Sequence, residues 1–199
     1  MKTYFSTPYR FAGMPDELSS YEKSRVVILP VPYDATTTYR SGSREGPKAI
    51  INASRFLPLY DEETGKLVGQ NGICTLDEMD PVADVERMLE RVYSAWQQLL
   101  EDGKKVVMIG GEHSLTAAAV KAAAKKWKNL SVLHIDAHLD MRSEEEGYDH
   151  SCVMQRCSGH AKIVSVGIRS ATMEEADFAQ QHATVFWDKD IHGSDDWIQ

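Results

Sequence analysis

The sequence predicts an α/β fold in which parallel strands are covered by helices. Short apolar runs alternate with amphipathic stretches along the chain, and glycine, proline or polar residues bound each run. This alternation is typical of strands joined by helical crossovers, which bring functional loops to the carboxyl edge of a sheet. With 199 residues the chain can bury one sizeable core, and we expect residues 1–199 to form a single domain.

Five short apolar runs are predicted to form the strands. Each run lies between turn-forming residues, which favours a buried strand over a helix. The predicted strands are Arg25–Pro30, Lys105–Ile109, Ser131–Ile135, Lys162–Val166 and Thr184–Trp187. Residues 32–80 are rich in glycine, proline and threonine with little periodicity, so we expect long loops with short elements inside.

Three stretches carry a helical signal. Residues 82–100 place apolar side chains at 3.6-residue spacing, which predicts an amphipathic helix. Asp80, which a proline follows, is the expected N-cap, and Gly103 is the expected terminator. The other two helices are predicted over Leu115–Lys126, which has lysines in its last turn, and over Met173–His182.

The charge balance argues against two classes of partner. The formal net charge is −8 and the pI is about 5.4, whereas nucleic acid and anionic membranes need clustered positive charge. A small cationic substrate suits this sign better. Residues 1–6 lack the apolar core of a signal peptide, and the longest apolar run, Val26–Val31, is too short to cross a bilayer. We therefore predict a cytoplasmic protein, with Cys74, Cys152 and Cys157 as reduced thiols.

An acidic and imidazole cluster follows the predicted strand at 131–135. If the strand continues, alternation directs Asp136, His138 and Asp140 to the same face. Two carboxylates beside an imidazole suit a hard divalent ion such as Mn²⁺, and a bound cation would compensate the buried acids. The alternative is that Asp140 caps the next segment and His138 only packs.

Further polar residues follow other predicted strands. The Gly-Gly pair at 110–111 lets the chain turn sharply and leaves His113 near a helix start, although no nucleotide-phosphate motif is present. Taken alone, His113 is more typical of a surface or helix-start histidine than of a ligand. His150, in the loop after the proposed metal strand, could shuttle protons near neutral pH. Asp188 and Asp190 have no histidine partner in their motif and are expected in a turn or helix cap.

Taken together, the motifs at 110–114, 136–140 and 150–154 resemble the arginase/agmatinase (ureohydrolase) family in both order and spacing. The combination of Asp-Ala-His-x-Asp with an upstream Gly-Gly-Glu-His is highly specific. Further stretches that look like the family lie at 31–34, 41–50 and 167–170.

The resemblance implies a three-layer α/β/α fold with a mainly parallel sheet, whose edge holds two Mn²⁺ ions bridged by a hydroxide. Carried over residue by residue, His113 and Asp140 would bind one ion and His138 the other. Asp136 would bridge both ions, and His150 matches the proton-shuttle histidine of the family. The family also implies a homo-oligomer, either a trimer or a hexamer.

The implied reaction is hydrolysis of a small cationic guanidino substrate to urea and an amine. The sequences at 110–114 and 150–154 look most like those of bacterial agmatinases. The first expectation is therefore hydrolysis of agmatine to putrescine and urea. Arginase, guanidinobutyrase and formimidoylglutamase share these motifs and stay open.

The chain departs from the family after residue 187. The family completes its site with a later Ser-x-Asp-x-Asp-x-x-Asp-Pro strand, which is not in this sequence and which Asp188 and Asp190 do not replace. We therefore expect a domain that is incomplete at the C-terminus. His113, Asp136, His138 and Asp140 would then be part of a larger ligand set. The rival hypothesis is an inactive ureohydrolase-like subunit that acts by association.

Overall fold

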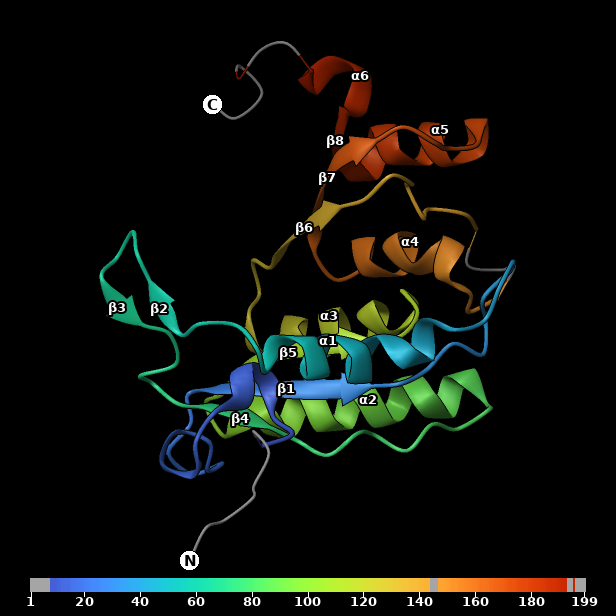
Figure 1. Cartoon of the computed structure of the whole chain (residues 1–199). Helices are drawn as coiled ribbons and strands as arrows, with labels where there is room; N and C mark the ends of the chain where they lie inside the picture. Colours follow the sequence, from blue (N-terminus) through green and yellow to red (C-terminus); the bar gives the residue numbers. More distant parts are fainter. Residues whose placement is uncertain (1–7, 144–146, 193–194, 196–199) are drawn as a thin grey trace, which may run out of the picture. The chain divides into compact units, whose positions relative to one another are not determined.

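A computed structural model describes residues 8–143, 147–192 and 195 of the chain. The predicted α/β class with parallel strands is confirmed (Figure 1). Two compact units are present, one of Met1–Ala83 with Ala95–Glu112 and one of Asp84–Ser94 with His113–Gln199. A single domain over the whole chain therefore stays a prediction. The first six residues, on which the signal-peptide argument depends, lie outside the described part.

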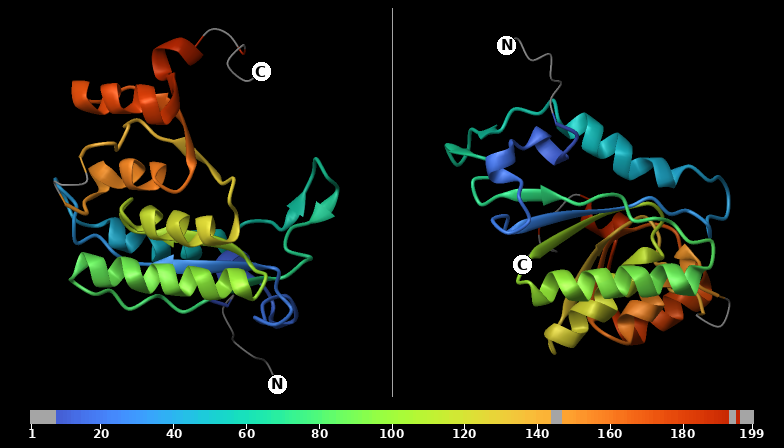
Figure 2. Two further views of the ribbon diagram at one scale, coloured as in Figure 1. Left: turned by 180° about the vertical axis from the view of Figure 1, so that it is seen from behind. Right: turned by 90° about the horizontal axis from the view of Figure 1, so that it is seen from below.

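The first unit contains a parallel sheet in the order β4-β1-β5. β1 (Val26–Val31) is central and almost wholly buried, which explains its continuous apolar sequence. It pairs in register with β4 (Ile73–Thr75) on one side and with β5 (Lys105–Gly110) on the other. Helix α1 (Gly46–Ser54) packs against β1 and β5 (Figure 2).

The region predicted as long loops contains more regular structure than expected. Besides α1 and β4 it holds the antiparallel pair β2 (Tyr60–Asp61) and β3 (Lys66–Leu67). The single-turn 3₁₀ helices of this unit are Phe11–Gly13, Asp16–Leu18 and Ser43–Glu45.

Helix α2 covers Val85–Glu101, three residues later than predicted at its start. The N-cap is Asp84 rather than Asp80, because Asp84 Oδ1 accepts a hydrogen bond of 2.8 Å from Arg87 N–H. The predicted terminator is confirmed, since Gly103 adopts φ +73° just after the helix.

The second unit contains a parallel sheet in the order β6 (Ser131–Ile135), β7 (Lys162–Ile168) and β8 (Ala183–Trp187). Helices α3 (Leu115–Lys126) and α5 (Met173–His182) occupy the predicted ranges. A 3₁₀ turn at His150–Cys152, helix α4 (Val153–Ser158) and helix α6 (Asp188–Ile191) were not predicted. Helix α4 packs against α3 and β7, and α5 packs against β8.

The core of the second unit lies between its sheet and helices. Its buried members include Val120, Leu139, Met154, Cys157, Ile163 and Ile168. Asp188 and Asp190 fall in the first turn of α6, whose N-cap is Trp187 without a side-chain capping hydrogen bond, so the expected turn or cap role stays a prediction. In the described part of the chain, no helix has the length and apolarity needed to cross a membrane.

All three cysteines are free thiols and are buried in the described structure. Burial raises the pKa of the Cys157 thiol to about 12.

Candidate metal centre

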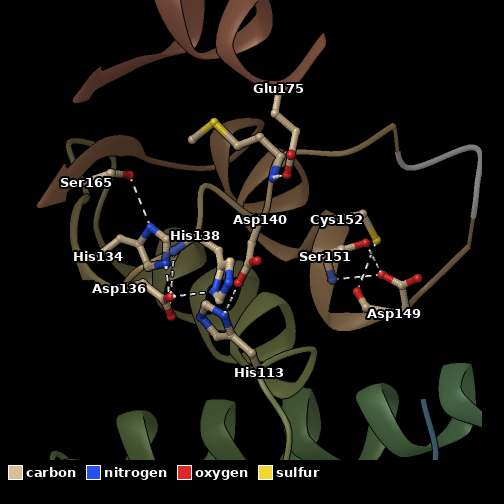
Figure 3. Close-up of polar contacts among 11 residues, drawn as sticks. His113, His134, Asp136, His138, Asp140, Asp149, Ser151, Cys152, Ser165 and Glu175 are labelled. Atoms are coloured by element: carbon tan, nitrogen blue, oxygen red, sulfur yellow. Dashed lines mark hydrogen bonds and ion pairs between the residues drawn. The ribbon is translucent and has the colours of Figure 1, made fainter. Parts of the chain in front are cut away.

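The residues singled out by the sequence meet in the second unit, at the carboxyl end of β6. Asp136, His138 and Asp140 follow β6, His113 precedes α3, and His150 starts the 3₁₀ turn before α4. All five line one open cleft of about 380 Å³. Figure 3 shows the imidazole of His113 and the carboxylates of Asp136 and Asp140 directed toward one another.

Backbone pairing with β7 fixes the start of the motif. Asp136 N–H donates to the Val166 carbonyl at 3.2 Å, and the Ala137 carbonyl accepts from the N–H groups of Arg169 and Ser170 at 2.8 and 3.0 Å. The bulge in β7 is formed at Gly167, whose φ of +86° strongly favours glycine. The stretch at 167–170 therefore holds the metal motif in place.

Asp140 reaches the cleft by a different route from the one predicted. Strand β6 ends at Ile135, and Asp140 adopts a left-handed backbone with φ +50°, so strand alternation does not continue to it. Its carbonyl accepts from Met154 N–H at 2.8 Å, which ties it to α4. Our expectation of one extended strand through residue 140 is thus corrected, although the side chains still share the cleft.

The backbone after Asp140 is held by a buried carboxylate that the sequence analysis did not single out. Glu175 is 6% exposed, and its Oε1 accepts from Met141 N–H at 3.2 Å. Its Oε2 accepts from Thr172 N–H at 2.8 Å, while the Thr172 hydroxyl accepts from Glu175 N–H at 3.2 Å. This is a capping box at the start of α5, and the Thr-x-x-Glu pattern at 172–175 could have revealed it.

The carboxylates of the cleft are surrounded by donors. Asp140 Oδ2 lies 2.7 Å from His113 Nδ1, and Asp136 Oδ1 accepts from His138 N–H at 2.9 Å. Burial alone would raise the pKa of Asp136, but the His138 N–H and the histidines nearby outweigh burial and leave this pKa below its ordinary value. Asp136 is therefore an anion at neutral pH, as a metal ligand must be.

His138 and His150 occupy the cleft in different ways. The His138 side chain is 62% exposed, and its Nδ1 lies 3.4 Å from Asp136 Oδ1. Nδ1 of His150 is buried with no hydrogen-bond partner among the described residues. The turn around His150 is closed by Asp149, which accepts from Ser151 N–H at 2.7 Å.

The donor set suits a divalent metal ion. One ligand atom from each of His113, His134, Asp136 and Asp140 lies within 4.8 Å of the others, and these are oxygen and nitrogen donors. His134 was not predicted, although its place on β6 two residues before Asp136 puts it on the same side of the strand. Burial lowers the pKa of His134, and the neighbouring His113 adds to this effect, so the ring is neutral at neutral pH.

The glutamate of the Gly-Gly-Glu-His motif has a structural place in the first unit. Glu112 is buried, and its carboxylate accepts from the Thr36 backbone N–H at 2.8 Å and also contacts the Thr36 hydroxyl. Nearby, Asp34 accepts from Gly42 N–H and from Arg44 Nε, each at 2.6 Å. The stretches at 31–34 and 41–50 are thus held together by the buried carboxylate of Asp34.

The chain is similar to known proteins in both sequence and structure. An N(1)-aminopropylagmatine ureohydrolase of Synechocystis sp. is 35% identical over 96% of this chain and 68% of the relative. An agmatinase of Halalkalibacterium halodurans is 36% identical over 81% of this chain and 58% of its own length. The crystal structure of an agmatine ureohydrolase of Thermoplasma volcanium superposes with a TM-score of 0.85 at 32% identity, over 96% of this chain and 65% of that one.

The chain thus spans between about half and two thirds of the length of most of these relatives. The sequence profile of the arginase family matches residues 24–196, which is most of the chain. The chain therefore belongs to the arginase family.

Proposed function

We propose that this chain catalyses the metal-dependent hydrolysis of a guanidino compound, in which agmatine and water give putrescine and urea. The observation that carries the proposal is the convergence of His113, Asp136 and Asp140 in one cleft at the carboxyl edge of a parallel sheet. Enzymes built on parallel sheets place their functional groups at this edge. The chain also belongs to the arginase family, which agrees with such a use of the cleft.

The proposed ions are two Mn²⁺ per complete active site. His113 and Asp140 would hold one ion, His138 the other, and Asp136 both. The exposure of His138 and its closeness to Asp136 leave its imidazole free to turn toward a second ion beside that carboxylate. When bound, the ions supply a nucleophile at neutral pH by lowering the pKa of water, and they stabilise developing negative charge.

The reaction also needs a group that moves a proton. When the carbon–nitrogen bond to the amine breaks, the departing nitrogen needs a proton, and His150 lines the same cleft. We assign its imidazole the role of carrying that proton.

A second candidate substrate is N(1)-aminopropylagmatine. The relative of that name in Synechocystis matches 96% of this chain, more than the 81% matched by the Halalkalibacterium agmatinase. Both compounds present the same guanidinium to the cleft and differ in the polyamine tail. A substrate panel therefore decides between them.

The test measures urea released by the Mn²⁺-loaded chain from agmatine, N(1)-aminopropylagmatine, arginine and 4-guanidinobutyrate. We expect D136A and H138A to lower activity by more than about 100-fold and to reduce bound Mn²⁺. D188N, which removes an acid from α6 outside the cleft, is the matched control and should change neither quantity. Unchanged metal content in D136A would contradict the ligand assignment, and no urea from any substrate while two Mn²⁺ ions are bound would refute the hydrolase.

We also propose that the protein is a cytoplasmic homo-oligomer, as its family suggests. Size-exclusion chromatography with light scattering tests this directly, because a trimer and a hexamer of a 22.3 kDa chain differ twofold in mass.

A further inference from the structure

His134 lies beside the proposed metal ligands but has no part in the ligand assignment above. Its side chain is only 4% exposed and projects from β6 toward Asp136 (Figure 3). Nδ1 lies 3.1 Å from the Ser165 hydroxyl on β7, whereas Nε2 is buried with no hydrogen-bond partner among residues 8–143, 147–192 and 195. A buried nitrogen without a hydrogen-bond partner destabilises the folded protein, so a functional role for this nitrogen at the site would explain its position.

The surroundings of the ring select its tautomer. Nε2 lies 3.7 Å from Asp136 Oδ2, where an N–H would be attracted to the carboxylate and a lone pair would be repelled. The Ser165 side chain is fully buried, and its hydroxyl can donate to Nδ1. With Nδ1 as the acceptor, the proton of the neutral ring resides on Nε2. The arrangement is a hydroxyl, an imidazole and a carboxylate in series.

We propose that His134 is a positioning residue of the metal site, in which Ser165 holds the imidazole and Nε2–H orients the carboxylate of Asp136. The inference rests on the proposed function, because Asp136 is the ligand assigned to both ions. The His113 ring stacks on the same imidazole, with centroids 5.4 Å apart and an interplanar angle of 28°. His134 thus supports two proposed ligands at once, one by charge and one by packing.

Direct ligation by His134 is the opposing possibility and makes different demands. Its Nε2 would have to present a lone pair to the ion, so Nδ1 would carry the proton and donate a hydrogen bond to the Ser165 hydroxyl. A positioning group needs only a donor near Nε2, which an amide can supply. A ligand needs the imidazole itself. Losing an outer partner of a metal ligand typically weakens metal binding about 10–100-fold.

The experiment is an EPR titration of the full chain with Mn²⁺. The glutamine of H134Q places an amide N–H near the Nε2 position, the shorter side chain of H134N reaches only the Ser165 side, and H134F keeps a ring without polar atoms. We expect about 10–100-fold weaker binding in H134F and H134N, and binding within about threefold of wild type in H134Q. H160Q, which removes an exposed histidine of the same unit, is the matched control.

The outcomes separate the possibilities. Equal weakening in H134Q and H134F, together with loss of a nitrogen coupling in the spin-echo spectrum of bound Mn²⁺, would overturn positioning in favour of ligation. Wild-type affinity in H134F would remove any role. If circular dichroism shows that H134F does not fold, the H134Q and H134N pair carries the comparison. Absence of urea release by the wild type with two Mn²⁺ ions bound, together with rescued Mn²⁺ binding in H134Q, would refute the proposed function and leave the positioning role standing.

Discussion

Replacing Glu175 by glutamine tests whether the start of α5 holds the metal loop. Both carboxylate oxygens accept from backbone N–H groups, at 3.2 Å from Met141 and at 2.8 Å from Thr172. An amide has one oxygen and one NH₂ group. In either orientation, one of these two N–H groups would face a donor, so one buried hydrogen bond is lost and one donor is left without an acceptor.

The magnitude follows from the burial of the group. A hydrogen bond to a charged partner contributes about 1.5–3 kcal/mol, and Glu175 is 6% exposed, so little of this is recovered from water. We expect E175Q to lower the free energy of unfolding by about 2–3 kcal/mol, which lowers the melting temperature by about 4–12 °C in a chain of this size. Because Met141 directly follows Asp140, Mn²⁺ affinity should fall as well.

The control is E174Q, which removes the same charge from the same helical turn. Glu174 is exposed and loses only its interaction with the helix dipole, about 0.3–1 kcal/mol. Urea unfolding followed by circular dichroism gives the stability, and equilibrium dialysis gives the Mn²⁺ affinity. If E175Q and E174Q agree within about 0.5 kcal/mol and bind Mn²⁺ equally, the buried carboxylate does not hold the loop and the reasoning fails.

Three further outcomes can be measured on the chain. G111A should lose more than about 3 kcal/mol of unfolding free energy, because its Cβ would lie 2.0 Å from the Tyr33 carbonyl oxygen; G159A, with its closest contact at 3.7 Å, should be nearly neutral. The hydrogen bond from Arg44 lowers the pKa of Asp34 below 3.8, so its stabilisation is present above that pH and is lost as pH falls through the lowered pKa; D34N should flatten this acid limb of the stability curve. Cys157, with a pKa of about 12, should resist iodoacetamide at pH 8 until urea is added, as mass spectrometry can show.

The sequence predicted an element accurately where both its apolar pattern and its boundary residues were recognisable. Strand β6 and helices α3 and α5 have the predicted ranges, because each combines an apolar pattern with clear boundary residues. Helix α1 was missed because its apolar positions do not form one buried face: Ile51 is buried, whereas Ile50 is 48% exposed. Helix α4 is six residues long, which is too short for a period to be recognised.

The choice between Asp80 and Asp84 shows a different limit. Both are aspartates shortly before the apolar stripe of α2, and the proline after Asp80 favoured the earlier residue. What decides the start is where the side-chain oxygen meets a free N–H, and this occurs at Asp84. Sequence pattern gives the approximate start of a helix, whereas the N-cap depends on a local hydrogen bond.

The candidate site was partly predictable for a similar reason. Functional residues of a parallel α/β fold are expected in the loops that follow strands, and His113, Asp136, His138, Asp140 and His150 do line one cleft. The contribution of His134 and Ser165 depends on two strands in register, with residue 134 opposite residue 165, and no local pattern reports that pairing. Their roles, like those of the proposed ligands, stay predictions until metal binding is measured.

The hydrogen bonds also indicate that the protein itself, rather than a bound ion, sets the shape of the cleft. Ala137 is tied to the end of β7, the carbonyl of Asp140 to α4, and the N–H of Met141 to α5. Three separate elements therefore fix five consecutive residues, and they do so with backbone groups that take no part in the chemistry. An ion entering such a site has only side chains to reorient, because the backbone already holds its conformation. The left-handed conformation of Asp140 persists for the same reason, since its own carbonyl is bonded to α4 and the N–H of Met141 is bonded to α5.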